Sequence, residues 1–209
     1  AEYVDRISKG DIPPKITDSY NGDFNEIKNN LNQCIDIMKG LLEETGNLIN
    51  ATKAGHLDTR GNAKNFPGGW GTLVGGVNDL IDAFVNPINV TAEYVDRISK
   101  GDIPPKITDS YNGDFNEIKN NLNQCIDAVS FLIADAGMLS RAAVEGKLDT
   151  RADTTKHHGD FRTIVEGVNN TLDAVIGPLN VAAEYVDRIS KGDIPPKITD
   201  SYNGDFNEI

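Results

Sequence analysis

The stretch AEYVDRISKGDIPPKITDSYNGDFNEIKNNLNQCID, residues Ala1–Asp36, decides the architecture, because it occurs again unchanged at Ala92–Asp127. Its first 27 residues occur a third time at Ala183–Ile209, and the offset is 91 residues both times. The stretches between the copies, residues 37–91 and 128–182, are equally long and less alike. Internal copies of this kind predict an array of repeated units instead of one compact core.

A shorter repeat of about 45 residues lies within the 91-residue period. A glycine followed two residues later by Ile or Leu recurs at alternating spacings of 45 and 46, at Gly10, Gly55, Gly101, Gly146 and Gly192. An aromatic residue precedes each of the last four glycines by 31 residues, at Phe24, Trp70, Phe115 and Phe161. The connectors from a glycine to the next aromatic residue vary between 14 and 15 residues. Helices of constant length are expected where units must stay in rotational phase, since each added residue rotates a helix by about 100°.

The stretches of constant length carry the pattern of coiled-coil helices. Apolar or small residues follow each aromatic at spacings of three and four, and we call this row the seam; the first comprises Phe24, Ile27, Leu31, Cys34, Met38, Leu41, Thr45, Leu48 and Thr52. Pro87 and Pro178 lie in two seams, and the unbroken phase across them favours a local kink over a helix stop. The fold class expected is all-α: concatenated parallel four-helix coiled-coil bundles formed by a homodimer, with two helices per unit joined by an extended connector.

The connectors are of two types. Those of the first type follow Gly10, Gly101 and Gly192, and those of the second type follow Gly55 and Gly146. The first type has two isoleucines beside a Pro-Pro pair, such as Ile103 and Ile107. Because Pro-Pro forces an extended path, this connector is expected to run back along the helices with both isoleucines tucked in. Gly61 and Ala152 replace the second isoleucine in the second type, for which a looser hold is expected.

Composition and charge argue against several classes of partner. With 32 acidic and 20 basic residues the formal net charge is −12, which disfavours binding to nucleic acid or anionic lipid. The apolar runs are expected to be too short to span a bilayer. The chain also lacks an initiator Met, so we expect an interior slice of a longer protein. Cys34 and Cys125 occupy equivalent positions, which predicts buried thiols in a reducing compartment.

The sequence contains no constellation typical of catalysis or metal binding. The run Gly68–Gly71 lacks the lysine of a phosphate-binding loop and is interpreted as a helix start. The adjacent His157 and His158 cannot face one metal ion from a helix, so a solvated connector is expected there. The oxygen-rich run Asp18–Glu26 fails the ligand spacing of a calcium loop and fits an Asx turn and helix N-cap. We therefore expect no enzyme activity, no cofactor and no metal.

These repeats resemble the HAMP domain, the signal-transmitting module of bacterial chemoreceptors, histidine kinases and adenylyl cyclases. The first helix of that family opens with Pro and closes at Gly, as do the stretches from Pro87 to Gly101 and from Pro178 to Gly192, whereas Leu41 and Leu132 replace the Pro elsewhere. The two apolar anchors of the family's connector match Ile103 and Ile107. The acidic start of the second helix is matched by Asp114, with Leu122 and the frequent Asn at Asn123 after it.

The resemblance covers the whole chain and implies a parallel homodimeric rod whose units alternate between two helix packings. Five HAMP-like units are expected, at residues 1–36, 37–86, 87–127, 128–177 and 178–209, with the first helix of the first unit and the second helix of the last unit truncated. The core position six residues before the glycine, which in the family helps to set helix rotation, is Val4, Ile49, Val95, Ser140 and Val186. Alternation of Val with Ile or Ser would suit two unit types with opposed preferred packings.

Two functions from different classes stay open. The preferred one is a non-catalytic relay between an upstream sensor and a downstream signalling domain in the same parent chain, as in a methyl-accepting chemotaxis receptor-like protein or a sensor histidine kinase. Its expected location is the cytoplasmic part of a membrane-anchored receptor, with membrane contact only through parts outside this slice. The alternative is a structural spacer or filament, which the identical copies suggest. A small-ligand module is third, because no polar constellation lies on the seam.

Overall fold

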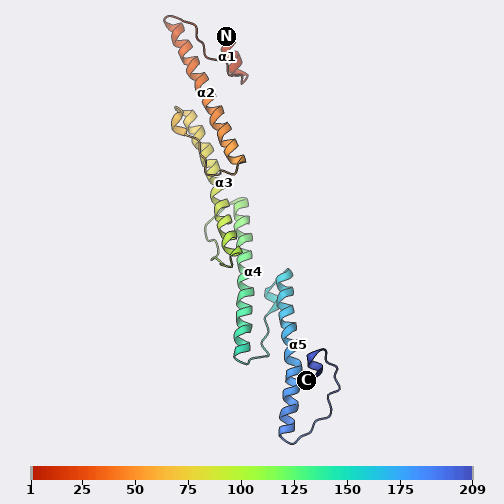
Figure 1. The fold of residues 1–209 in the computed structure, drawn as a ribbon. Helices are drawn as coiled ribbons and strands as arrows, with labels where there is room; N and C mark the ends of the chain where they lie inside the picture. Colours follow the sequence, from red (N-terminus) through yellow and green to blue (C-terminus); the bar gives the residue numbers. More distant parts are fainter. Residues whose placement is uncertain (1, 209) are drawn as a thin grey trace. The chain divides into compact units, whose positions relative to one another are not determined.

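The computed structural model describes residues 2–208, and this part of the chain contains helices and no strand. Four helices are long, and they follow one another in the chain: α2 Asp23–Lys53, α3 Gly69–Ser99, α4 Gly113–Val144 and α5 Gly159–Ser190. Figure 1 labels each of them. Their lengths are 31 or 32 residues, as the repeat predicts. Short helices α1 Glu2–Ser8 and α6 Asp205–Glu208 lie near the ends, and the 3-10 turns η1 Ala63–Asn65 and η2 Thr154–Lys156 lie in the second-type connectors. The all-α fold class is confirmed.

The repeated glycines end the helices where the sequence predicts. Gly101 follows α3 with a φ of 79°, in the left-handed region that L side chains rarely adopt. The glycines at the same place in the other repeats share this conformation: Gly10, Gly55, Gly146 and Gly192. The prolines behave as the unbroken phase indicates, since Pro87 lies inside α3 and Pro178 inside α5 and neither stops its helix.

The chain divides into two compact units, residues 1–93 and 94–209, and each is described by itself. In the first unit the connector after α2 returns along the helix, so that α3 begins beside α2 and runs in the same direction (Figure 1). In the second unit α4 and α5 are joined in the same way and contact each other directly. The parallel helices and extended connector expected of each repeat are therefore present within one chain.

The seam is left largely uncovered within one chain. The buried apolar residues of the long helices mostly lie one position after a seam residue: Val74 follows Leu73, and Val165 follows Ile164. The seam residues Leu73 and Ile164 are themselves 55% and 49% exposed, whereas Val74 and Val165 are 5% and 3% exposed. The small core of the chain thus lies between helix and connector, and the seam faces away from it.

Both cysteines illustrate the same arrangement. Cys34 is half-buried and Cys125 is exposed, and neither forms a disulfide in the described structure. The prediction of buried thiols is therefore wrong for a single chain, because both residues belong to the uncovered seam and not to the core beneath the connectors. The residue after each cysteine, Ile35 or Ile126, is buried instead.

Among residues 2–208, one helix is long and apolar enough to cross a membrane, and it is α4. On length and composition alone, the expectation that no stretch could span a bilayer does not hold for this helix. Only 11% of its most apolar stretch is buried within the chain. Two of its polar side chains, Asn123 and Asp135, bind connector groups, as described below.

Candidate functional site

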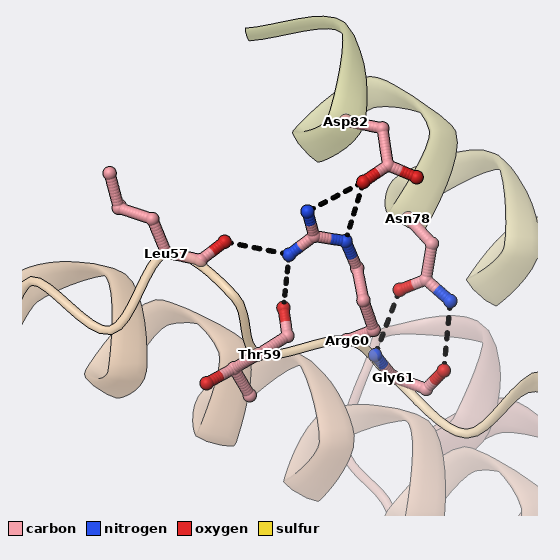
Figure 2. A network of polar contacts seen from close by, with 6 residues as sticks. All are labelled: Leu57, Thr59, Arg60, Gly61, Asn78 and Asp82. Atoms are coloured by element: carbon pink, nitrogen blue, oxygen red, sulfur yellow. Dashed lines mark hydrogen bonds and ion pairs between the residues drawn. The ribbon is translucent and has the colours of Figure 1, made fainter. Parts of the chain in front are cut away.

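Each connector between two long helices, and the connector before α2, is fastened to the start of the following helix by one asparagine side chain. In the second-type connector after α2, the Asn78 Oδ1 accepts a hydrogen bond from the backbone N–H of Gly61 at 2.8 Å. The Asn78 Nδ2 donates to the carbonyl of the same residue, also at 2.8 Å. Both backbone groups of one extended residue are thereby satisfied by a single amide, as Figure 2 shows. We call this pair of bonds the connector clamp.

The clamp is present four times in the described residues. The paired residues are Asn32 with Ile16, Asn78 with Gly61, Asn123 with Ile107, and Asn169 with Ala152. The clamped residue always lies six positions after the helix-ending glycine, so the extra residue of the second-type connectors falls after the clamp. In those connectors that later segment contains η1 or η2. The clamp therefore fixes the connector against the helix whatever the length of the loop that follows.

An ion pair accompanies every clamp. The residue before the clamped one is basic, and it pairs with an aspartate four residues after the clamping asparagine. The pairs are Lys15 with Asp36 at 2.5 Å, Arg60 with Asp82 at 2.6 Å, Lys106 with Asp127 at 2.6 Å and Arg151 with Asp173 at 2.6 Å. A spacing of four places Asn and Asp on the same face of the helix. That face therefore binds two consecutive connector residues, the clamped residue and the basic residue before it.

The second-type connectors have further hydrogen bonds that we did not predict from the sequence. The Arg60 guanidinium donates to the carbonyls of Leu57 and Thr59 at 2.7 and 2.8 Å while it binds Asp82 (Figure 2). Arg151 makes the corresponding bonds in the other copy. A Cβ on Gly61 would approach the Val74 side chain to 2.8 Å, so the glycine lets the connector lie directly on the helix. The looser hold that we expected from the missing isoleucine is thus offset by polar contacts and close approach.

The histidine that we expected to be solvated is a buried connector residue. His157 is 2% exposed, and its Nε2 lies 2.7 Å from the Asp135 Oδ2 of α4. The expectation is wrong because the connector folds this ring against the helix; the adjacent His158 is exposed as expected. No group of three or more His, Cys, Asp or Glu residues in the described part of the chain could hold a metal ion.

The other second-type connector, after α2, has a different residue at the position of His157. Phe66 stands where His157 stands, and it lies against Gly40, whose added Cβ would be 3.2 Å from the Phe66 ring. In the later copy Phe131 occupies the position of Gly40. The earlier copy therefore has its aromatic ring on the connector and a glycine on the helix. The later copy has the aromatic ring on the helix and a hydrogen-bonded histidine on the connector.

The first-type connectors are locked at their beginning instead. The guanidinium of Arg97 near the end of α3 binds Asp102, just past Gly101, with an Nε–Oδ2 distance of 2.6 Å. The same pair recurs as Arg6 with Asp11 and Arg188 with Asp193, both at 2.7 Å. Hydrogen bonding to the guanidinium lowers the pKa of all three aspartates. In the second-type connectors Ala51 and Ala142 replace the arginine, so this lock is missing there.

One further carboxyl is perturbed. The hydroxyl and the backbone N–H of Thr155 both donate to Asp153, at 2.6 and 3.0 Å, and the hydroxyl bond is the larger cause of its lowered pKa. Asp153 caps η2 through the bond from the Thr155 N–H, as Asn62 caps η1. The second-type connectors thus begin their final turn with an Asx-type cap.

The site residues predicted from sequence fall into two groups. The positions predicted to set helix rotation are exposed within one chain: Val4 at 56%, Ile49 at 48%, Val95 at 52%, Val186 at 68% and Ser140 in the exposed class. The connector anchors behave differently, since Ile107 is buried at 7% and Ile103 is half-buried. The proline after the first isoleucine, Pro13 or Pro104, is buried more deeply than either. Asp114 lies in the first turn of α4, where a negative charge is favourable.

Burial of the anchors differs between the copies. Ile12 and Ile16 are half-buried, whereas Ile194 and Ile198 are 84% and 45% exposed. Sequence reasoning identified the isoleucines but missed the clamp. The signal that could have revealed it is an Asn followed four residues later by Asp, which recurs at the start of all four long helices.

Helices joined in parallel by an extended, clamped connector, repeated along the chain, define a class of concatenated helix–connector–helix modules. The HAMP domain family matches residues 1–40, 65–130 and 156–209, and each matched segment contains one first-type connector. The chain belongs to the HAMP domain family, whose members are non-catalytic modules that relay signals between sensor and output domains. No solved structure matches this chain. The tandem arrangement expected from the sequence is thereby confirmed.

Proposed function

We propose that this chain is a homodimeric relay that passes a change of helix packing from an upstream sensor to a downstream output domain of a bacterial receptor, in the cytoplasm. The observation that carries the proposal is the uncovered seam. Exposed apolar seam residues occur on every long helix: Phe24 and Ile27 on α2, Leu73 and Leu80 on α3, Ile118 on α4, and Ile164 and Val168 on α5. Soluble proteins do not leave continuous apolar rows on long helices in water, so the seam requires a partner.

A partner that covers this seam has to contact all four long helices, because each of them has exposed seam residues. A second copy is the partner that the family suggests, because two parallel helices per unit become four when the chain pairs with itself.

The unmatched segments 41–64 and 131–155 belong to the same array in this proposal. Their connectors have the same clamp and the same ion pair at the same distance from the glycine as the matched ones. Five units, at 1–36, 37–86, 87–127, 128–177 and 178–209, then alternate between two types. One has the arginine–aspartate pair beside the glycine, and in the other the arginine before the clamped residue also binds carbonyls of its own connector. The rotation-setting residues Val4, Ile49, Val95, Ser140 and Val186 would lie in the dimer core, and two unit types with opposed packing preferences would make the array bistable.

The experiment is to place the full chain between a ligand-binding sensor and a cyclase output domain, and to compare two deletions. Removing residues 11–55 deletes one unit of 45 residues, and removing residues 11–101 deletes two units of 91 residues. Both deletions join Gly10 to a connector, so the helix ends are preserved. A relay with alternating units predicts that the ligand response changes sign or is lost after the single deletion and keeps its sign after the double deletion. Ligand-independent output from all three proteins, including the full chain, would favour the spacer.

A further inference from the structure

The repeat creates an ambiguity for any dimer of this chain. If a second copy pairs with the first after a shift of 91 residues, Ala1–Asp36 lies beside Ala92–Asp127, and these sequences are identical. Residues 92–118 then lie beside 183–209, which are identical as well. First-type connectors and the helix segments next to them therefore cannot distinguish the aligned pair from the shifted one. A shifted pair would also leave uncovered seam at both ends, and further chains could add without limit.

We propose that the seam residues of segments 37–91 and 128–182 set the register of the dimer and so select a closed pair of chains over a filament. This inference rests on the dimeric relay proposed above. The two segments are the part of the chain that differs between registers, since residue 37 of one chain would face residue 128 of the other.

The two segments differ in side-chain size on the uncovered surface. At four exposed positions the residue of the earlier segment is larger than its counterpart 91 residues later: Ile49 against Ser140, Trp70 against Phe161, Leu80 against Thr171 and Phe84 against Val175. The last three pairs lie on the seams of α3 and α5, and Ile49 and Ser140 are positions predicted to set helix rotation. The earlier segment therefore has a bulky partner-facing surface and the later one a slim surface.

The aligned dimer keeps layers of equal size together. Each layer of a parallel dimer contains the same position from both chains, so Leu80 meets Leu80 and Thr171 meets Thr171. In the shifted pair every one of these four layers combines a larger residue with a smaller one, which leaves a void on one side or changes the spacing between the helices. Close-packed interiors tolerate neither change without loss of stability.

The native cysteines report the register directly, because Cys34 and Cys125 are themselves 91 residues apart. Short bis-maleimide cross-linking of the full chain, read by mass spectrometry of isotope-mixed protein, should give links from Cys34 to Cys34 and from Cys125 to Cys125. We expect links between Cys34 and Cys125 to be at least about tenfold rarer, which corresponds to about 1.4 kcal/mol. Comparable amounts of both kinds in the wild type would overturn the register proposal while leaving the dimer intact. Absence of any link between chains, together with a monomer mass by light scattering, would overturn the dimer itself.

Equalising the two surfaces should remove the selection. One variant enlarges the slim surface with the substitutions S140I, F161W, T171L and V175F, and a reciprocal variant reduces the bulky surface with I49S, W70F, L80T and F84V. In either one we expect the Cys34–Cys125 share to rise about tenfold and species larger than two chains to form. A control variant equalises exposed positions away from the seam with R141N, E145A and K147H, and it should retain the wild-type pattern. If both equalised variants keep helical circular dichroism and wild-type links, the seam does not set the register.

Discussion

Replacing Asn78 with Ala removes both hydrogen bonds that hold Gly61 against α3. Each bond is 2.8 Å long and partly buried, so together they contribute about 2 kcal/mol to holding the connector in place. The ion pair between Arg60 and Asp82 remains, and the connector should therefore open locally while the helices stay folded. Because about 1.4 kcal/mol is a factor of ten, amide hydrogen exchange at Gly61 should become about 30-fold faster.

The assay is hydrogen exchange read by mass spectrometry on peptides from the second-type connectors. These connectors are the right place to measure, because the peptides of Ala1–Asp36 and Ala92–Asp127 cannot be told apart by mass. The clamp of Asn169 on Ala152 serves as the internal reference and should exchange as in the wild type. Asn89→Ala, at an exposed position of the same helix, is the matched control. Wild-type exchange at Gly61 in the Asn78→Ala protein would refute the reasoning that the clamp holds the connector.

Three further outcomes are expected. Gly101→Ala should lower the free energy of unfolding by about 1–2 kcal/mol in urea titrations, because the residue has a φ of 79°. Asp102→Asn should lower the melting temperature at pH 7 but not at pH 2.5. The reason is that the Arg97 guanidinium lowers the pKa of Asp102. The stabilisation by this ion pair is therefore present above the unfolded-state pKa of the carboxyl and disappears as the pH falls below about 4. A double-mutant cycle on His157→Ala and Asp135→Ala should give a coupling energy of about 0.5–3 kcal/mol, and additive effects would contradict a direct bond.

Much of the fold could be predicted from the sequence, because its determinants are local and periodic. The constant spacing of 31 residues and the helix-ending glycines set the helices, and the phase across Pro87 correctly indicated that α3 continues through it. Glycine positions such as Gly101 could be identified because a left-handed residue after a helix has few alternatives. The repeat itself then placed equivalent elements in each copy.

The clamp and the burial of His157 could not be predicted, since both depend on contacts between segments 16 to 22 residues apart. From sequence alone, an asparagine near a helix start could equally face solvent or bind the connector. Only the path of the connector brings Gly61 to Asn78. His157 is buried because Asp135 on the preceding helix offers an acceptor, which neither residue reveals alone. The seam was recognised, but a row of apolar residues does not itself say whether the chain's own connector or a second chain will cover it.

Sedimentation equilibrium of the purified chain tests the central claim most directly, because that claim is that a second copy covers the seam. The account predicts a single species of two chains, twice the 22.7 kDa of one, that persists into the low micromolar range. It also predicts that Leu73→Glu on the seam dissociates this species, whereas Asp79→Lys, on the exposed surface beside the seam, does not. A stable 22.7 kDa species at tens of micromolar would contradict it, since the uncovered seam would then have no partner in a second chain.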